Sequence, residues 1–236
     1  MLKNDFQKVS IIIPVYNEKD TFLTILKKAQ DSQINGLSQE IIIVDDGSTD
    51  GTKDILANIS QNGIKIFYHQ KNFGKGEALQ TGFSQASGDI IIIQDADLEY
   101  DPAEYQDLVK PILEGNADIV YGSRFVGDKP HRVLYFWHYL GNKIVVLFSN
   151  IVTNLNLTDV ETCYKAFRKE VLDKIKLKEK GFGFENEFTI KAARQKFRFY
   201  EVGISYTGRT YQEGKKIKLR DAFLAMWCIL RYGIFG

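Results

Sequence analysis

Four consecutive isoleucines, Ile90–Ile93, constrain the fold of this chain more than any other feature. A continuous β-branched run of this length is typical of a strand that is buried on both faces of a parallel sheet. The runs 9–13 and 41–44 follow the same pattern, and 64–69 and 119–121 are further strand candidates. The helix-compatible segments between these strands are 19–33, 51–60 and 75–85. The alternation predicts an α/β fold with an open, mostly parallel, Rossmann-like sheet flanked by helices.

The rest of the chain continues without a linker or an internal repeat. The pattern changes after residue 125, to an apolar and aromatic segment at 133–152, helices at 169–177 and 186–195, a strand at 198–205 and a terminal helix. With 236 residues, 44% of them hydrophobic and 26% charged, we expect one globular domain over residues 1–236. The net charge of +1 gives no reason to expect a nucleic acid partner.

Polar residues follow three of the predicted strands directly, in the segments 14–18, 45–48 and 94–97. The carboxyl ends of parallel strands meet at one edge of the sheet, where ligands bind in open α/β folds. The sequence therefore predicts a binding site at this edge.

Two aspartates, Asp95 and Asp97, follow the isoleucine strand, and alternate residues of a strand share a face. Two carboxylates suit Mg²⁺ or Mn²⁺, which take one or two carboxylates together with phosphate oxygens and water. Such a cation would neutralise a leaving diphosphate, and Glu99 adds a third acid. Alternatively, the pair is a solvated acidic turn in which Asp97 caps a helix that begins near residues 101–102.

Two further strand-to-helix connections are candidate contacts for a nucleotide. Asp45 could accept a hydrogen bond from a nucleobase N–H, although a plain strand–turn–helix connection explains most of the segment 45–52. Segment 72–76 contains two glycines and Lys75 at a helix start, where backbone N–H groups could meet a phosphate. A glycine-rich turn with an exposed lysine is the alternative.

A basic segment near the C-terminus holds five cations within twelve residues, with Gly208 and Gly214 as candidate hinges. A bidentate guanidinium makes a strong, oriented contact with a diphosphate. A solvated basic turn is the alternative. The cations are Arg209, Lys215, Lys216, Lys218 and Arg220.

The ordered motifs IIIPVYNE (11–18), DDGSTDGT (45–52), NFGKG (72–76), DAD (95–97) and GSRF (122–125), with the basic segment 209–216, resemble glycosyltransferase family 2. Within it they are most similar to the polyprenyl-phosphate sugar synthases of the dolichol-phosphate mannose synthase type. The resemblance covers most of the chain. It implies the GT-A fold, an inverting mechanism and a divalent cation, Mg²⁺ or Mn²⁺. It also implies a nucleotide-sugar-binding part at 1–125 and an acceptor-binding, C-terminal helical part at 126–236.

The resemblance assigns roles to single residues. Asp97, Arg124 and Arg209 are the expected catalytic residues; Arg124 would meet the acceptor phosphate and Arg209 the donor diphosphate. Asp95, Asp97 and Glu99 would serve the metal. The residues expected to bind substrate are Pro14, Tyr16, Glu18, Asp45, Asp46, Lys75, Asp95, Ala96, Lys215 and Lys216.

The implied reaction moves a hexose from a nucleotide-sugar, of the GDP-mannose or UDP-glucose type, to a polyprenyl or dolichyl phosphate. No apolar run reaches the about 20 residues of a membrane span, and the N-terminus predicts no secretory signal. Segments 133–148 and 219–230 combine aromatic side chains with flanking cations, which suits helices at a membrane interface. We therefore expect a cytoplasmic, peripheral protein on the inner membrane face. A separate membrane protein or a second copy could be its partner, and core packing or a dimer interface would give the same composition.

Three other activities compete with this interpretation. Transfer to a sugar hydroxyl, as in cell-wall or surface polysaccharide synthesis, would need a base, for which Asp159 and Glu161 are the candidates. A nucleotidyltransferase could share the acids at the strand end, but its glycine-rich, arginine–lysine entry loop is missing. A non-catalytic nucleotide-sugar-binding module is the third.

Overall fold

The computed structural model describes residues 6–133, 135–214 and 219–235, except the side chains of Leu219 and Arg220. Its strands are β1 (Lys8–Val15), β2 (Ser38–Asp45), β3 (Ile64–Tyr68), β4 (Ile90–Ile93), β5 (Ile119–Ser123), β6 (Lys165–Arg168) and β7 (Phe199–Gly203). The helices are α1 (Phe22–Asp31), α2 (Thr52–Ala57), α3 (Lys75–Gln85), α4 (Tyr105–Leu113), α5 (Phe136–Thr153), α6 (Glu170–Lys174), α7 (Phe184–Arg194) and α8 (Leu219–Ile234). A short 3₁₀ helix, η1 (Pro102–Glu104), precedes α4.

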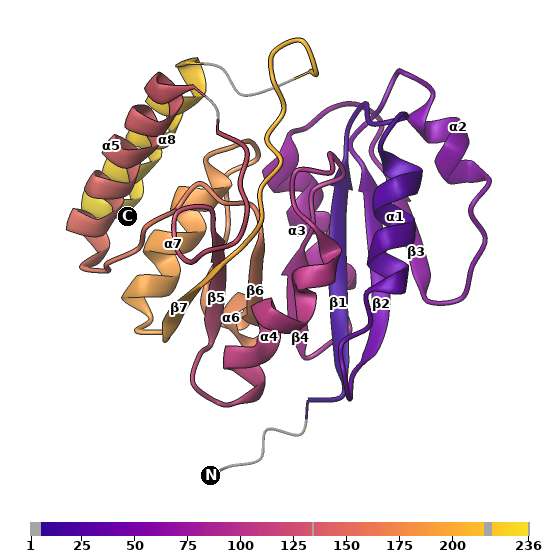
Figure 1. The fold of residues 1–236 in the computed structure, drawn as a ribbon, viewed down its shortest axis with the longest axis horizontal. Coiled ribbons are helices and arrows are strands. Elements are labelled where there is room, and N and C mark those ends of the chain that lie inside the picture. The colour runs from indigo at the N-terminus through magenta and orange to yellow at the C-terminus, as the bar shows by residue number, and fades with distance from the viewer. Residues whose placement is uncertain (1–5, 134, 215–218, 236) are drawn as a thin grey trace.

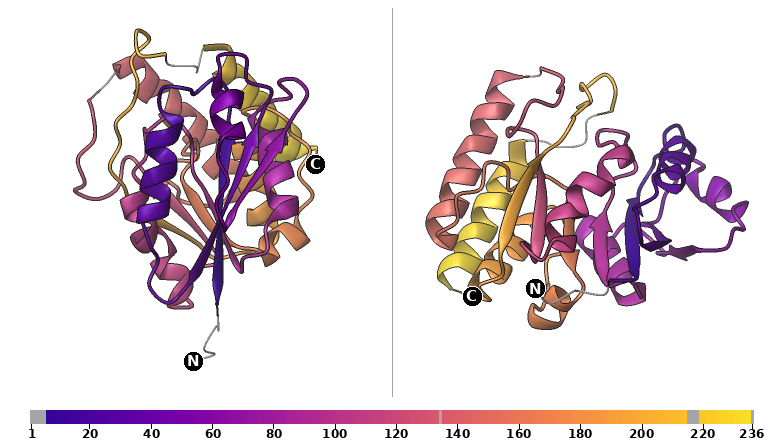
Figure 2. Two further views of the ribbon diagram at one scale, coloured as in Figure 1. Left: turned by 90° about the vertical axis from the view of Figure 1, so that its right-hand side faces the viewer. Right: turned by 60° about the horizontal axis from the view of Figure 1, so that its bottom comes forward.

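The seven strands form one sheet in the order β3-β2-β1-β4-β6-β5-β7. All neighbours pair in parallel except β6, which runs antiparallel to both β4 and β5. Helices cover both faces of the sheet (Figures 1 and 2). The predicted α/β fold with an open, mostly parallel sheet is therefore confirmed.

The isoleucine runs are buried on both faces because successive side chains of a strand point to opposite sides. Ile11, Ile13, Ile90 and Ile92 join one core cluster with side chains of α1 and α4. Ile12, together with Ile91 and Ile93 of β4, joins the other cluster with side chains of α3 and α7. Both faces of these central strands are thus apolar, and the polar residues of the predicted site lie beyond the strand ends.

Several predicted elements differ in extent from the observed ones. The first helix begins at Phe22 instead of residue 19, because the backbone N–H groups of Thr21 and Phe22 both donate to the carbonyl of Glu18 in a preceding turn. The second helix covers Thr52–Ala57 instead of 51–60. Asp101, and not Asp97, caps the helical turn at Pro102, since its carboxylate accepts the N–H of Ala103.

Helices α5 and α8 lie side by side at one end of the sheet, beyond α7 (Figures 1 and 2). Their C-terminal ends meet where Gly233 packs so closely on Val152 that an added Cβ would lie 2.2 Å from it. Much of their outer surface is apolar and exposed, including Trp137 at 76% and Phe223 at 70%. None of the helices in the described part of the chain is both long and apolar enough to cross a membrane.

Candidate active site

The carboxyl ends of four parallel strands bring the predicted site residues to one edge of the sheet. Asp45 ends β2, and Arg124 directly follows β5. Asp95 and Asp97 follow β4, and Glu18 lies just beyond β1. The loop that carries Arg209 passes over this edge, at the top of Figure 1. The predicted convergence of three polar strand ends is therefore what the structure has.

The acids after β4 differ in their surroundings. Burial, and then the negative charges of Asp95 and Glu99, raise the pKa of Asp97 to about 7. Both oxygens of Glu99 accept hydrogen bonds, one from the Tyr206 hydroxyl at 2.9 Å and one from the Arg209 backbone N–H at 2.7 Å. Glu99 therefore holds the loop that passes over the site, whereas the sequence assigned it to the metal.

Lys75, predicted to grip a phosphate, instead lies against the acids in this structure. Its Nζ is 2.6 Å from Oδ1 of Asp95 and 3.8 Å from Oε1 of Glu185. Burial disfavours the charged amine, but Asp95 and Glu185 outweigh it and raise the pKa of Lys75 well above its usual value. Lys75 therefore stays protonated, and its positive charge balances the negative charge of Asp95.

The two aspartates at the end of β2 differ in their hydrogen bonds. Asp45 is fully buried; one carboxylate oxygen accepts the N–H of Ser48, and the other has no hydrogen-bond partner among the described residues. Asp46, predicted to bind substrate, instead accepts the N–H groups of Phe73 and Gly74 and contacts His69. It fixes the loop before α3, which leaves Asp45 as the carboxylate with unused hydrogen-bonding capacity.

The remaining residues predicted to contact the donor lie at the same edge. Pro14 and Tyr16 are partly buried at the end of β1. Ala96 is 3% exposed and packs in the core cluster that contains Ile90. Its backbone can still face a ligand, but its side chain is used for packing. Lys215, Lys216 and Lys218 lie outside the described residues.

Arg209 and Glu18 form an ion pair that joins the basic loop to the turn after β1. The Nη1 and Nη2 atoms lie 3.1 and 2.8 Å from the two oxygens of Glu18. Nε and Nη2 also donate to the carbonyl of Asp97, at 3.1 and 2.7 Å. The loop is anchored on its other side as well, since Arg132 donates to the carbonyl of Gly208 and Tyr211 pairs with His138. The guanidinium thus contacts the backbone of Asp97, one of the acids predicted to hold the metal.

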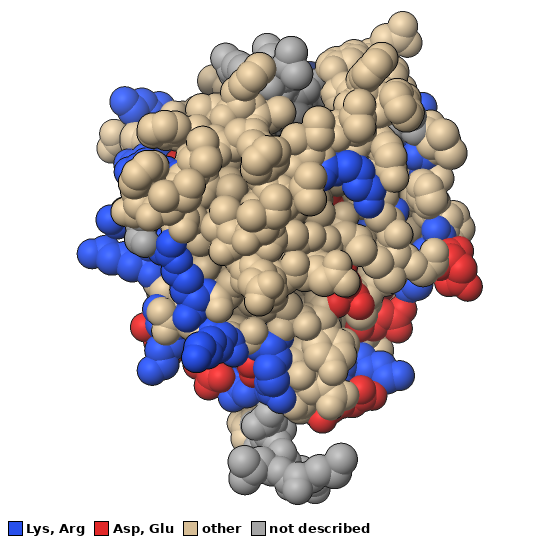
Figure 3. All heavy atoms as spheres, turned by 90° about the vertical axis from the view of Figure 1, so that its left-hand side faces the viewer, with Lys and Arg blue, Asp and Glu red and all other residues tan. Residues whose placement is uncertain are grey.

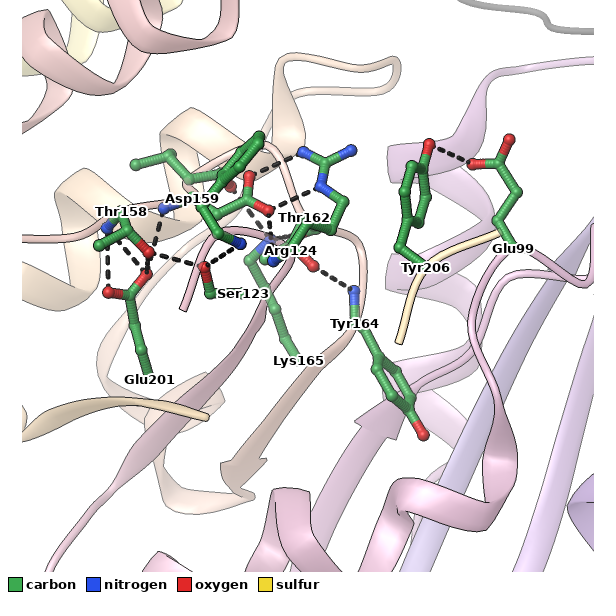
Figure 4. Close-up of polar contacts among 12 residues, drawn as sticks. Glu99, Ser123, Arg124, Thr158, Asp159, Thr162, Tyr164, Lys165, Glu201 and Tyr206 are labelled. Carbon is green, nitrogen blue, oxygen red and sulfur yellow. Dashed lines mark hydrogen bonds and ion pairs between the residues drawn. The ribbon is translucent and has the colours of Figure 1, made fainter. Parts of the chain in front are cut away.

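Arg124 is held by Asp159, as Figure 4 shows. Nε and Nη2 of Arg124 lie 2.6 and 2.7 Å from the two oxygens of Asp159, which is fully buried. Burial opposes the charge of Arg124, but Asp159 raises its pKa well above the usual value. Glu201 in turn accepts the backbone N–H groups of Thr158 and Asp159. The guanidinium is fixed in place, and Asp159 is occupied as its partner.

Glu161, the other candidate base, sits among buried polar side chains behind Arg124. It accepts a hydrogen bond from Asn186 at 2.8 Å. Burial raises the pKa of Glu161 to about 7; the Asn186 hydrogen bond lowers it and the negative charge of Glu185 adds to the increase. The carboxyl can therefore change its protonation state near neutral pH.

Three residues of the site were not among the sequence predictions. The ring of Tyr206 lies 5.1 Å from the Arg124 guanidinium. Glu201 orients the segment that carries Asp159, and Glu185 contacts Lys75. Only Glu185 gave a signal in the sequence, as the acid that ends a glycine–aromatic segment before a helix.

The residues after β4 can accommodate a divalent cation. In the part of the chain that the structure describes, no three His, Cys, Asp or Glu side chains are arranged as a ready metal site. Two carboxylates nevertheless suit Mg²⁺ or Mn²⁺ when phosphate oxygens and water supply the other ligands. Burial and the nearby negative charges of Asp95 and Glu99 both raise the pKa of Asp97, and a cation would offset the repulsion among these three carboxylates.

Comparisons with known proteins agree on one family. Residues 10–176 match the sequence model described as "Glycosyl transferase family 2". A dolichol-phosphate mannosyltransferase of Pyrococcus furiosus is 32% identical over 89% of this chain, and the chain spans only 60% of its length. A polyprenol monophosphomannose synthase of Mycolicibacterium smegmatis is 29% identical over 98% of this chain and 88% of its own. Both carry the names of the subgroup that the motifs resemble.

A solved structure has the same fold. Glucosyl-3-phosphoglycerate synthase from Mycobacterium tuberculosis, in complex with Mn²⁺, uridine diphosphate and phosphoglyceric acid, superimposes with a TM-score of 0.75. The match covers 97% of this chain and 79% of that structure, at 21% sequence identity. The GT-A fold implied by the sequence is therefore confirmed.

Proposed function

The chain belongs to glycosyl transferase family 2 and is a glycosyltransferase, and we propose that it moves a hexose from a nucleotide-sugar to a polyprenyl phosphate with the help of a divalent cation. The observation that carries this proposal is that Asp95 and Asp97 follow β4 and that the guanidinium of Arg209 contacts the backbone of Asp97. Acids for a cation and a guanidinium beside them are what a departing diphosphate requires.

The donor half of the proposal is supported by two features. Asp45 has a buried carboxylate oxygen that no residue in the described part of the chain contacts by a hydrogen bond, which suits an N–H of a nucleobase. Asp95 and Asp97 would hold Mg²⁺ or Mn²⁺, and the cation when bound would neutralise charge on the diphosphate. The similar synthase from M. tuberculosis contains Mn²⁺ and uridine diphosphate, which is consistent with this assignment. Arg209 would exchange Glu18 for the diphosphate.

The acceptor half rests on Arg124. A fixed guanidinium is a geometrically specific partner for a phosphate, and Asp159 and Glu201 fix this one. A phosphate acceptor is already largely ionised near neutral pH, so positioning and charge neutralisation suffice without a strong base. The engagement of Asp159 with Arg124 fits a phosphate better than a hydroxyl acceptor, because a base needs a free carboxylate. The names of the two similar transferases also mention polyprenyl or dolichol phosphate.

A polyprenyl acceptor would bring the protein to a membrane. The outer surface of α5 and α8 carries exposed Phe136, Trp137, Phe223 and Trp227, which suit the interface between headgroups and acyl chains. The N-terminal end of α5 adjoins the Arg209 loop through His138 and Tyr211. We infer that this surface lies on the cytoplasmic leaflet, with the active-site edge of the sheet next to it. A second copy of the chain or a membrane protein could share it.

Transfer assays with labelled donors test the proposal. We expect release of a nucleoside diphosphate and formation of a lipid-linked hexose, dependent on both polyprenyl phosphate and Mn²⁺ or Mg²⁺. A panel of guanosine- and uridine-based donors identifies the base and the sugar. Undiminished transfer in the presence of a chelator would exclude the role of the cation. Transfer to a sugar hydroxyl in place of the lipid phosphate would overturn the acceptor assignment.

A further inference from the structure

A basic hollow lies between the loop after α6 and the last turn of α7, away from the active-site edge. Its volume is ≈ 340 Å³, and five cations line it. They are Lys174, Lys176, Lys178, Lys191 and Arg194. None of them belongs to the site described above.

The charge in this basic hollow is only partly balanced. Lys191 pairs with Glu187 at 2.5 Å, and Arg194 donates to a backbone carbonyl. Lys174, Lys176 and Lys178 are exposed and form no salt bridge with any described residue. A lysine in the last turn of a helix gains from the helix dipole, which explains Lys174. Lys176 and Lys178 lie beyond any helix, so the dipole does not account for them.

The basic hollow adjoins the C-terminal end of the apolar α5/α8 surface. Nη2 of Arg194 donates to the carbonyl of Gly233 at 2.9 Å, and Nζ of Lys191 lies 4.8 Å from the centre of the Tyr232 ring. The next residues, Ile234 and Phe235, are 61% and 82% exposed. In Figure 3 Lys and Arg side chains gather along the lower flank of a broad uncharged face. Cations and exposed apolar side chains thus share one side of the molecule.

We propose that the basic hollow binds the phosphate of an anionic lipid headgroup while the exposed apolar side chains of α5 and α8 enter the membrane interface. This inference rests on the membrane contact in the proposed function and adds a lipid-specific site to it. Apolar insertion and electrostatic attraction to anionic lipids reinforce each other when they act on the same face. A soluble polyanion would use the lysines alone and would leave the neighbouring Ile234 and Phe235 without a role.

Vesicle co-sedimentation tests this site with the full chain. The probes are vesicles of phosphatidylcholine alone and vesicles that also contain phosphatidylglycerol, at physiological salt. The test variant combines Lys174→Gln, Lys176→Gln and Lys178→Gln. The matched control combines Lys27→Gln, Lys53→Gln and Lys110→Gln, which are exposed on α1, α2 and α4 and remove the same charge.

We expect the test variant to lose affinity for the phosphatidylglycerol vesicles by about fivefold per lysine, on the order of 100-fold in total. The control should lose little, and neither variant should change the weaker binding to phosphatidylcholine. Equal losses in both variants, or no loss in the test variant, would overturn the site.

Transfer to a detergent-dispersed, short-chain polyprenyl phosphate separates this proposal from the proposed function. We expect both variants to match the wild type in that assay, because the three lysines touch none of the active-site residues. If the wild type and both variants show no transfer, while the wild type still prefers phosphatidylglycerol vesicles and the test variant does not, the proposed reaction is wrong and the lipid site stands.

Discussion

Arg124, which directly follows β5, and Asp159 form a two-pronged ion pair with N–O distances of 2.6 and 2.7 Å. Asp159→Asn keeps the shape of the side chain and removes its charge. We expect the KM for polyprenyl phosphate to rise about tenfold, because the guanidinium loses its orientation. The folded state should also lose about 3 kcal/mol, as breaking a buried pair does. Steady-state kinetics with both phosphate and sugar acceptors check this, and a rate that is lost on sugar acceptors alone would reassign Asp159 as a base.

Activity should fall strongly when the forked guanidinium of Arg209 is replaced. In Arg209→Lys a single ammonium replaces a guanidinium that contacts both Glu18 and the carbonyl of Asp97. We expect kcat/KM for the donor to fall about 100-fold, which corresponds to about 2.7 kcal/mol. Arg132→Lys is the control, because Arg132 holds the same loop through the carbonyl of Gly208 and the carboxylate of Glu213. Similar losses in both variants would show that the loop as a whole matters and not the guanidinium of Arg209.

Asp97 should be required for the response to metal. We expect Asp97→Asn to abolish transfer and to remove the rise in melting temperature that Mn²⁺ with nucleoside diphosphate gives the wild type. Without metal the variant should melt at or above the wild-type temperature at pH 8, because the wild type then carries a partly buried charge. Thermal unfolding with and without Mn²⁺ tests both statements, and a metal shift that survives the substitution would remove Asp97 from the ligand set.

Glu161 should make the metal-free protein less stable as the pH rises. Its pKa is about 7 in the folded state and near the usual 4.5 when unfolded, so the folded state holds the extra proton between these values. The contribution of Glu161 to the free energy of unfolding is therefore fully present below about pH 4.5. It decreases as the pH rises from there through 7, by about 3 kcal/mol at most.

Glu161→Gln can keep the hydrogen bond from Asn186 and should flatten this dependence, as urea unfolding at pH 5 and pH 8 would measure. The exposed Glu114→Gln serves as the control. An unchanged slope in Glu161→Gln would assign the pH dependence to other groups.

Gly47 should tolerate no side chain, unlike its neighbour Gly51. Both have positive φ, of 72° and 99°. An added Cβ at Gly47 would lie 2.5 Å from the backbone of Lys71, whereas one at Gly51 would meet nothing within 4 Å. We expect Gly51→Ala to cost about 1 kcal/mol from strain alone. Gly47→Ala should cost more than that and should also weaken donor binding, because the turn after Asp45 must move; equal costs measured by denaturant unfolding would contradict this.

The sequence predicted those parts of the fold that local pattern determines. The isoleucine runs are buried on both faces, and that pattern is visible one strand at a time. Strand β6 was not predicted, because it is only four residues long and begins with a lysine. Lys165 can be buried there because its Nζ donates to the carbonyls of Val160 and Thr162 and lies 3.7 Å from Glu185, twenty residues later. Such a partner exists only in the folded chain.

In the site, too, short motifs could be predicted and contacts between distant residues could not. Asp95, Asp97 and Arg209 could be proposed as site residues because they stand in short motifs at predicted strand ends or in a basic loop. The contacts among these residues could not be predicted, since the pair of Glu18 and Arg209 spans 191 residues. Glu99 and Asp46 show the opposite case. They stand in the motifs, but the structure uses them to hold loops.

The two-sided attachment of the loop around Arg209 has a kinetic consequence. A diphosphate would compete with Glu18 for the guanidinium of Arg209, so arrival of the donor would weaken the attachment of the loop on the β1 side. The loop's other anchors are Arg132, just before α5, and His138 on α5, the helix proposed to contact the membrane. Binding of the nucleotide-sugar would thereby change the position of the loop next to α5, where the acceptor is proposed to arrive. The substrates would then bind in a compulsory order, donor first.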